Sequence, residues 1–200
     1  MVLSANAGFS SLKGVLDAEV QSLEEAGLTV AYSRIDKSDI SAANFQQTAL
    51  QFHEVLHAIF AAAATIPFRF PTWLTPSELR QHLHSGSARY KAFLTEHASH
   101  VQMEARIRLG PGEQVSPSLS GTEHLRARAA QIRELRDVAE KTKQAVFAEA
   151  VQWRERETPD GVRLFALVDR GNVASFREKL SQHGNLRVTG PWPTTEFLES

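Results

Sequence analysis

The sequence contains no cysteine, so disulfide frameworks, thiolate zinc sites and cysteine nucleophiles are excluded. It also lacks an excess of charge of either sign, because 22 Lys and Arg residues oppose 23 Asp and Glu residues, for a net charge of −1. A protein that binds nucleic acid or an anionic membrane through its overall charge is strongly basic. We therefore expect neither a nucleic-acid partner nor a membrane partner.

Long hydrophobic runs are absent as well. The least polar stretch, residues 58–68, is far shorter than the roughly 20 residues that a membrane-spanning helix needs. The first residues lack the basic charges and the continuous apolar run of a secretory signal. These features predict an intracellular, cytoplasmic protein.

Hydrophobic residues make up 42% of the 200 residues, a composition that supports a packed core. The pattern of expected elements predicts an α+β protein of two domains, residues 1–99 and residues 100–200 with a closing tail. No internal sequence repeat is visible. In the first domain, apolar spacing predicts helices over 10–26, 41–64 and 87–97, and Thr75 with Glu78 predicts the capped start of another helix. β-branched and aromatic residues predict a strand over 28–35, and the prolines within 66–72 predict an irregular strand there.

The second half alternates strands with helices. Apolar residues recur every seven positions from Leu125 to Trp153, which predicts one long charged helix over 122–157. The other expected elements are a strand over 101–109, a loop over 110–121, a strand over 162–168, a helix over 173–182, a strand over 186–189 and a turn at 190–193.

One catalytic motif occurs on the helix expected over 41–64. Residues 53–57 read His-Glu-Val-Leu-His, in which His53 and His57 lie one turn apart and Glu54 could activate a metal-bound water. A zinc hydrolase would need a third ligand, for which Glu78 has a suitable spacing and His82 and His84 are further candidates. The competing interpretation is an amphipathic helix with both histidines at its partly exposed edge.

A larger set of motifs resembles the GvpL/GvpF family of gas vesicle proteins. The resemblance begins with His53, Val55-Leu56 and the segment Ile66-Pro-Phe-Arg-Phe70 with Thr72, and continues through spaced leucines and His100-Val-Gln-Met-Glu104. It ends with Val188-Thr-Gly-Pro-Trp-Pro193 and Phe197, so it covers roughly residues 15–198. The chain departs from the family pattern at Pro71, Thr194 and Thr195.

This resemblance implies a fold and a function. It implies a ferredoxin-like N-terminal α+β domain and a C-terminal α/β domain with a long helix. It also implies a protein without enzymatic activity or cofactor, an accessory or minor structural component of gas vesicle assembly. Its partners would be the small hydrophobic shell protein and other accessory proteins, and its location the cytoplasmic gas vesicle. In this interpretation His57 is incidental, and a repurposed family member without a gas vesicle role is an alternative.

An accessory protein that covers a hydrophobic shell subunit needs apolar surface. The candidates are the exposed side of the helix over 41–64, the proline-interrupted segment 66–72 and the tail 192–197. The partner-binding residues that we expect there are Phe68, Arg69, Phe70, Trp192 and Phe197. The competing interpretation places the same side chains in the core between the domains.

Overall fold

The computed structural model describes residues 2–4, 12–108, 121–182 and 186–198. The chain divides into two compact units. Unit 1 holds residues 1–99 together with the closing segment 193–198, and unit 2 holds residues 100–192. The closing segment therefore groups with unit 1, whereas the sequence analysis placed it in the second domain. Three of its residues, Pro193, Thr194 and Phe197, are buried.

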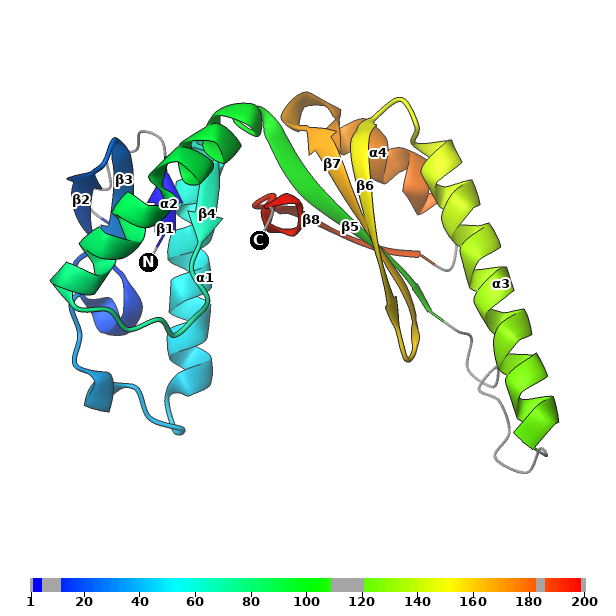
Figure 1. Ribbon diagram of the computed structural model, residues 1–200, viewed down its shortest axis with the longest axis horizontal. Helices are drawn as coiled ribbons and strands as arrows, with labels where there is room; N and C mark the ends of the chain where they lie inside the picture. Colours follow the sequence, from blue (N-terminus) through cyan, green and yellow to red (C-terminus); the bar gives the residue numbers. More distant parts are fainter. Residues whose placement is uncertain (1, 5–11, 109–120, 183–185, 199–200) are drawn as a thin grey trace. The chain divides into compact units, whose positions relative to one another are not determined.

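Unit 1 is an antiparallel sheet with two long helices (Figure 1). The sheet has the order β2(Gln21–Glu25), β3(Leu28–Tyr32), β1(Val2–Ser4) and β4(Thr65–Pro67). The helices are α1(Phe45–Ala62) and α2(Pro76–Glu96), and two single 3-10 turns, η1(Val15–Asp17) and η2(Lys37–Asp39), lie in the connections. Val2, Val20, Ala31 and Ile59 form a buried cluster between the sheet and α1, against which partly buried apolar residues of α1 pack.

The helix expected over residues 10–26 is wrong. In the described part of this stretch only η1 is helical, and residues 21–25 form β2, which pairs along its whole length with β3. Ala26 and Gly27 both have positive φ, 51° and 70°, and make the tight two-residue turn of a β-hairpin. Cross-strand pairing therefore overrode the apolar spacing. A ferredoxin-like domain carries an α-helix between its first two strands, and the described residues have only the turn η1 there.

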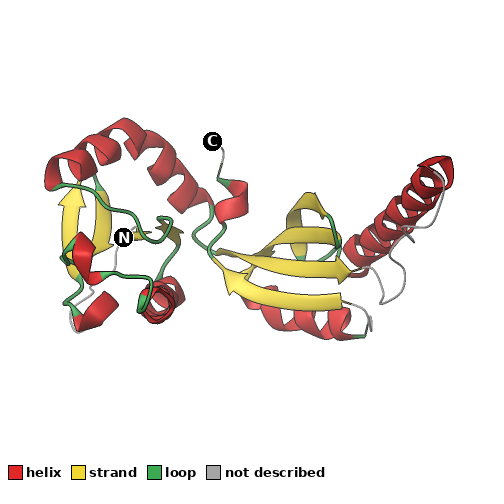
Figure 2. Cartoon of the chain, turned by 90° about the horizontal axis from the view of Figure 1, so that it is seen from below, coloured by secondary structure: helices red, strands yellow, loops and turns green. Residues whose placement is uncertain are grey.

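Unit 2 follows the order strand, helix, strand, strand, helix, strand. Figure 2 shows its strands side by side in one sheet. Its elements are β5(His100–Arg108), α3(Gly121–Ala145), β6(Ala150–Thr158), β7(Gly161–Asp169), α4(Val173–Ser181) and β8(Leu186–Trp192), with a 3-10 turn η3(Arg170–Asn172) before α4. The sheet is antiparallel in the order β6-β7-β5-β8. This β-α-β-β-α-β chain order is the split arrangement of ferredoxin-like domains, so the complete pattern lies in unit 2 rather than in unit 1.

The long helix expected over 122–157 is wrong in its second half. The helix α3 ends at Ala145, and residues 150–158 form the edge strand β6. β6 pairs with one edge of β7, whose other edge pairs with β5, so β7 lies inside the sheet. A hairpin around residues 158–161 joins the two strands, and at Gly161 an added Cβ would collide with the carbonyl oxygen of Ile107.

The remaining elements largely agree with the sequence. Thr75 caps α2 with the expected capping box, and α2 is one continuous helix where two were expected. β8 runs through Trp192 instead of turning at residue 190, with Gly190 at a positive φ of 117° where the pairing with β5 shifts register. The loop expected over 110–121 falls almost wholly outside the described residues. No helix in the described part of the chain is both long and apolar enough to cross a bilayer.

Candidate functional site

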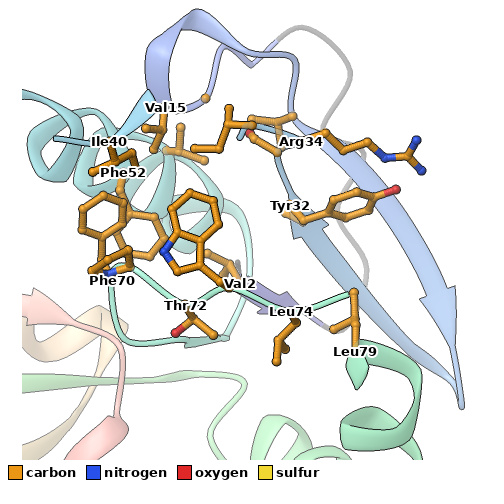
Figure 3. Close-up of a pocket in the computed structure, with 18 of the residues that line it drawn as sticks. Val2, Val15, Tyr32, Arg34, Ile40, Phe52, Phe70, Thr72, Leu74 and Leu79 are labelled. Carbon is orange, nitrogen blue, oxygen red and sulfur yellow. The ribbon is translucent and has the colours of Figure 1, made fainter. Parts of the chain in front are cut away.

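A cavity of about 860 Å³ opens into unit 1 (Figure 3). Its wall is built from η1, from the end of β3 with the segment that follows it, from α1, and from residues 69–74 with the start of α2. We call it the unit 1 groove. The apolar residues that define it in Figure 3 are Val15, Ile40, Phe52, Phe70, Leu74 and Leu79.

Stacked aromatic rings form one wall of the groove. Phe45 and Phe52 lie two turns apart on α1 and so share a helix face. The ring of Phe70 stacks on Phe52 with a centroid distance of 5.2 Å and contacts Phe45 at 5.7 Å. Phe70 reaches this position because β4 ends at Pro67 and the chain then crosses α1 without regular structure. The wall is therefore held by ring packing rather than by backbone hydrogen bonds of a sheet.

The base of the groove is continuous with the core of unit 1. Val2 belongs to the buried cluster, and Phe52 and Val55 pack against it. The turn η1 is tied to α1 because the backbone N–H of Leu16 donates to Oε1 of Gln51 at 2.9 Å. Leu16 and Asp17 have φ values of 55° and 58°. Leu16 lines the groove and is 36% exposed.

Charged groups lie at the margin of the groove. Arg34, Asp36, Asp39 and Arg69 contribute to its lining. Asp36 and Asp39 hold η2 through a reciprocal capping box, and the guanidinium of Arg34 lies 6.0 Å from the ring centroid of Tyr32. An apolar floor with a polar margin is the anatomy of a protein interaction site. Its volume lies within the about 300–1,000 Å³ of ligand pockets, so the groove has room for apolar side chains of a partner.

Exposed apolar side chains extend this surface. In unit 1, large hydrophobic residues remain exposed at Leu16 (36%), Phe45 (44%), Leu50 (58%) and Leu74 (40%). Leu16 and Leu74 line the groove, and Phe45 contacts its aromatic wall. Scattered exposed leucines need no explanation, but apolar residues gathered around one opening indicate a binding site.

The five partner-binding residues expected from the sequence lie in different places. Arg69 and Phe70 line the groove, and their contact with a partner stays a prediction. Phe68 is half-buried and packs edge-on against the ring of His82 at 5.4 Å. Trp192 is half-buried on β8 of unit 2, and Phe197 is only 5% exposed. Leu16, Ile40 and Leu74 also line the groove and were not expected from the sequence, although the apolar pair Trp73-Leu74 between two prolines was a usable signal.

The histidine motif does not assemble a metal site among the described residues. His53 and His57 are exposed on α1 with their rings 6.5 Å apart. The carboxylate of Glu78, the expected third ligand, instead accepts from the backbone N–H of Thr75 at 2.7 Å and from its hydroxyl at 2.8 Å. The backbone bond, followed by the hydroxyl bond, lowers the pKa of Glu78 and keeps the cap ionised.

The two alternative third ligands also have other partners. The Nε2 atom of His82 lies 2.8 Å from the hydroxyl of Tyr90, and Nε2 of His84 lies 2.9 Å from Oε1 of Glu25. Each candidate side chain therefore serves the packing or capping of α2. The structure gives the zinc hydrolase no third ligand within the described residues.

Comparisons with known proteins address the chain as a whole. Two solved structures match its fold with a TM-score of 0.81 each. One is the gas vesicle protein GvpF from Anabaena sp. PCC7120, at 15% sequence identity; the match covers 100% of this chain and 94% of that chain. The other is GvpF from Microcystis aeruginosa, at 14% sequence identity; the match covers 100% of this chain and 97% of that chain. No curated protein matches in sequence. The family model described as gas vesicle synthesis protein GvpL/GvpF matches residues 3–199, and the chain therefore belongs to the GvpL/GvpF family.

Proposed function

We propose that this protein is a non-enzymatic accessory or minor structural component of gas vesicle assembly that binds the small hydrophobic shell protein. The unit 1 groove is the proposed contact surface, and the cytoplasmic gas vesicle is the proposed location. The observation that carries the proposal is the coincidence, in a chain of the GvpL/GvpF family, of an apolar groove with exposed apolar residues around it.

The proposed mechanism is burial of apolar surface. A hydrophobic subunit that waits in water for assembly exposes side chains that would otherwise drive aggregation. Each large apolar side chain moved from water into the groove contributes about 1.5–3 kcal/mol. The charged margin, including Arg34 and Arg69, would orient the subunit rather than supply most of the affinity.

Co-purification tests the proposal. The chain is co-expressed with the shell protein of its own host, and capture is measured for the natural sequence and for Leu74→Glu and Phe70→Ala. Phe147→Glu is the matched control, because Phe147 is an apolar residue of unit 2 that is 82% exposed. We expect capture to fall at least about tenfold in both groove variants, since a buried charge or a lost ring costs more than about 1.4 kcal/mol, and to persist in the control.

Three results would count against parts of the proposal. Equal capture by the groove variants and the natural chain would remove the groove as the contact surface. Equal loss in the Phe147→Glu control would show non-specific adhesion. A folded natural chain that captures no shell protein would favour the repurposed family member. Melting temperatures of each variant separate lost binding from lost folding.

A further inference from the structure

The segment that follows β4 is attached to two helices at once. β4 ends at Pro67, so the chain beyond it lacks the regular alternation of a strand, in which residues 68 and 70 would point to the same side. The ring of Phe70 packs on Phe52 of α1, as Figure 3 shows. The ring of Phe68 instead packs edge-on against His82 of α2, with the centroids 5.4 Å apart. Two rings two residues apart therefore fasten this segment to different helices.

The imidazole that receives Phe68 is held in turn by a buried tyrosine. Nε2 of His82 lies 2.8 Å from the hydroxyl of Tyr90, and the two ring centroids are 5.7 Å apart. Tyr90 is only 5% exposed, and the guanidinium of Arg89 donates to the same hydroxyl at 3.4 Å. Hydrogen bonding of this kind between side chains restricts their rotamers. We call Phe68, His82 and Tyr90 the clamp.

The clamp depends on a glycine inside α2. Gly86 lies in the interior of this helix, although glycine is among the poorest helix formers. An added Cβ there would collide with Cε2 and Cζ of the Tyr90 ring. Side chains on a helix lean toward its N-terminus, over the residues three and four positions earlier. The Tyr90 ring therefore lies across Gly86 on its way to His82, and the glycine leaves room for the ring.

The clamped ring begins the stretch of chain that forms one side of the unit 1 groove. Phe70 follows two residues later, and Trp73 and Leu74 continue the lining. Within this stretch the hydroxyl of Thr72 donates to the carbonyl oxygen of Arg69. A binding surface whose side chains are held in place beforehand avoids the entropy cost of ordering them when a partner binds.

We propose that the clamp positions the aromatic wall of the unit 1 groove, so that the groove is formed before a partner arrives. His82, held by Tyr90 across Gly86, fixes Phe68, and Phe68 fixes the start of the segment that carries Phe70. Among the described residues that line the groove, none belongs to the clamp. The clamp residues therefore act on the wall and are positioning residues. Their effect on shell-protein capture rests on the proposed function.

Trp73 reports on the groove without any partner, because it lines the cavity and is half-buried. The sequence has three tryptophans, so Trp73 is the only one left in a full chain that carries Trp153→Phe and Trp192→Phe. Acrylamide quenching of its fluorescence measures how far the segment around it opens to solvent. Melting temperatures show that each variant is folded.

Three substitutions in this background each remove one part of the clamp: His82→Ala, Tyr90→Phe and Gly86→Ala. Tyr90→Phe keeps the ring and removes only the hydroxyl, so it tests the bond to His82 with the least change in packing. His84→Ala is the matched control, because this histidine lies on the same helix and contacts Glu25 instead. Shell-protein capture is measured for the same set of variants.

We expect the quenching constant of Trp73 to rise about twofold in the clamp variants, because the segment opens locally, and to stay unchanged in His84→Ala. Capture should fall at least about threefold in the clamp variants, since apparent affinity follows the fraction of molecules whose groove is formed. Unchanged quenching in folded His82→Ala and Tyr90→Phe, or an equal rise in His84→Ala, would overturn the proposal. A natural chain that captures no shell protein would count against the proposed function alone, because the quenching measurement needs no partner.

Discussion

At the scale of single residues, Glu104 connects stability to pH. Its side chain is 12% exposed and lies between two arginines. Burial is the largest single influence on its pKa and acts to raise it, but the hydrogen bonds and charges of Arg163, followed by those of Arg106, outweigh burial and hold the pKa below its usual value. Glu104 is therefore ionised in the folded protein over a wider pH range than in the unfolded chain.

We predict that Glu104→Gln lowers the free energy of unfolding by about 1.5–3 kcal/mol at neutral pH, the value of charged hydrogen bonds. Between the ordinary carboxyl pKa of about 4.3 and the lowered folded value, the unfolded chain binds more protons than the folded one. The stabilisation is complete above the ordinary pKa and is lost as pH falls through the folded pKa. Urea unfolding of both proteins at several pH values should show the difference shrinking in acid, and a constant difference would contradict the assignment.

At the scale of elements, the start of α2 depends on local chemistry. Thr75 and Glu78 form a reciprocal capping box, with Pro76 at the first helical position. These signals act within one turn, so the sequence alone located the start of the helix. The wall of the groove depends on this start, because Leu79 in the first turns of α2 lines the cavity.

Thr75→Ala is expected to cost about 1 kcal/mol of stability, because the backbone N–H of Glu78 loses its side-chain acceptor and the Glu78 carboxylate loses the hydroxyl donor while it keeps the backbone N–H of residue 75. Thr95→Ala, at an exposed position of the same helix, serves as the control and should stay within about 0.5 kcal/mol. Thermal or urea unfolding measures both. Equal effects of Thr75→Ala and Thr95→Ala would mean that the Thr75 hydroxyl of the capping box contributes nothing to stability.

Elements that depend on distant partners were misread. The apolar residues of 12–23 suit a helix by spacing, yet Leu23 pairs with Val30 in a hairpin. The stripe from Leu125 to Trp153 continues in sequence, yet Trp153 pairs with Ala166 as part of a strand. In both places hydrogen bonds and burial against a neighbouring strand decided the conformation, and neither is visible in a local window.

At the scale of the whole molecule, the closing segment links the end of the chain to unit 1. Phe197 is 5% exposed. We predict that Phe197→Ala destabilises the protein by about 3 kcal/mol, the lower end for a buried phenylalanine because terminal segments can open locally. Phe147→Ala, at an 82% exposed position, is the control and should have little effect.

The outcome also distinguishes the two interpretations of the tail. A large decrease in the free energy of unfolding, measured with urea, would assign Phe197 to the core. Unchanged stability with lost capture of the shell protein would instead make it a contact residue, as the family resemblance led us to expect.

The two sheets share one strand order, β2-β3-β1-β4 and β6-β7-β5-β8. No sequence repeat accompanies this likeness, because an antiparallel order is specified by pairing and register rather than by residue identity. For the same reason cross-strand neighbours are not visible in the sequence: Arg106 and Arg187 pair between β5 and β8 although they lie far apart along the chain.

The sequence by itself determined the features that act locally: the absence of cysteine chemistry, the caps, the helices α1 and α4, the strands β3, β5 and β7, and the motifs that resemble the GvpL/GvpF family. The tertiary structure alone decided the hairpins, the grouping of the tail with unit 1 and the groove around Phe70. The physical reason is range. Capping bonds and periodic burial act within a few residues, whereas a groove or a cross-strand pair exists only after distant segments have paired.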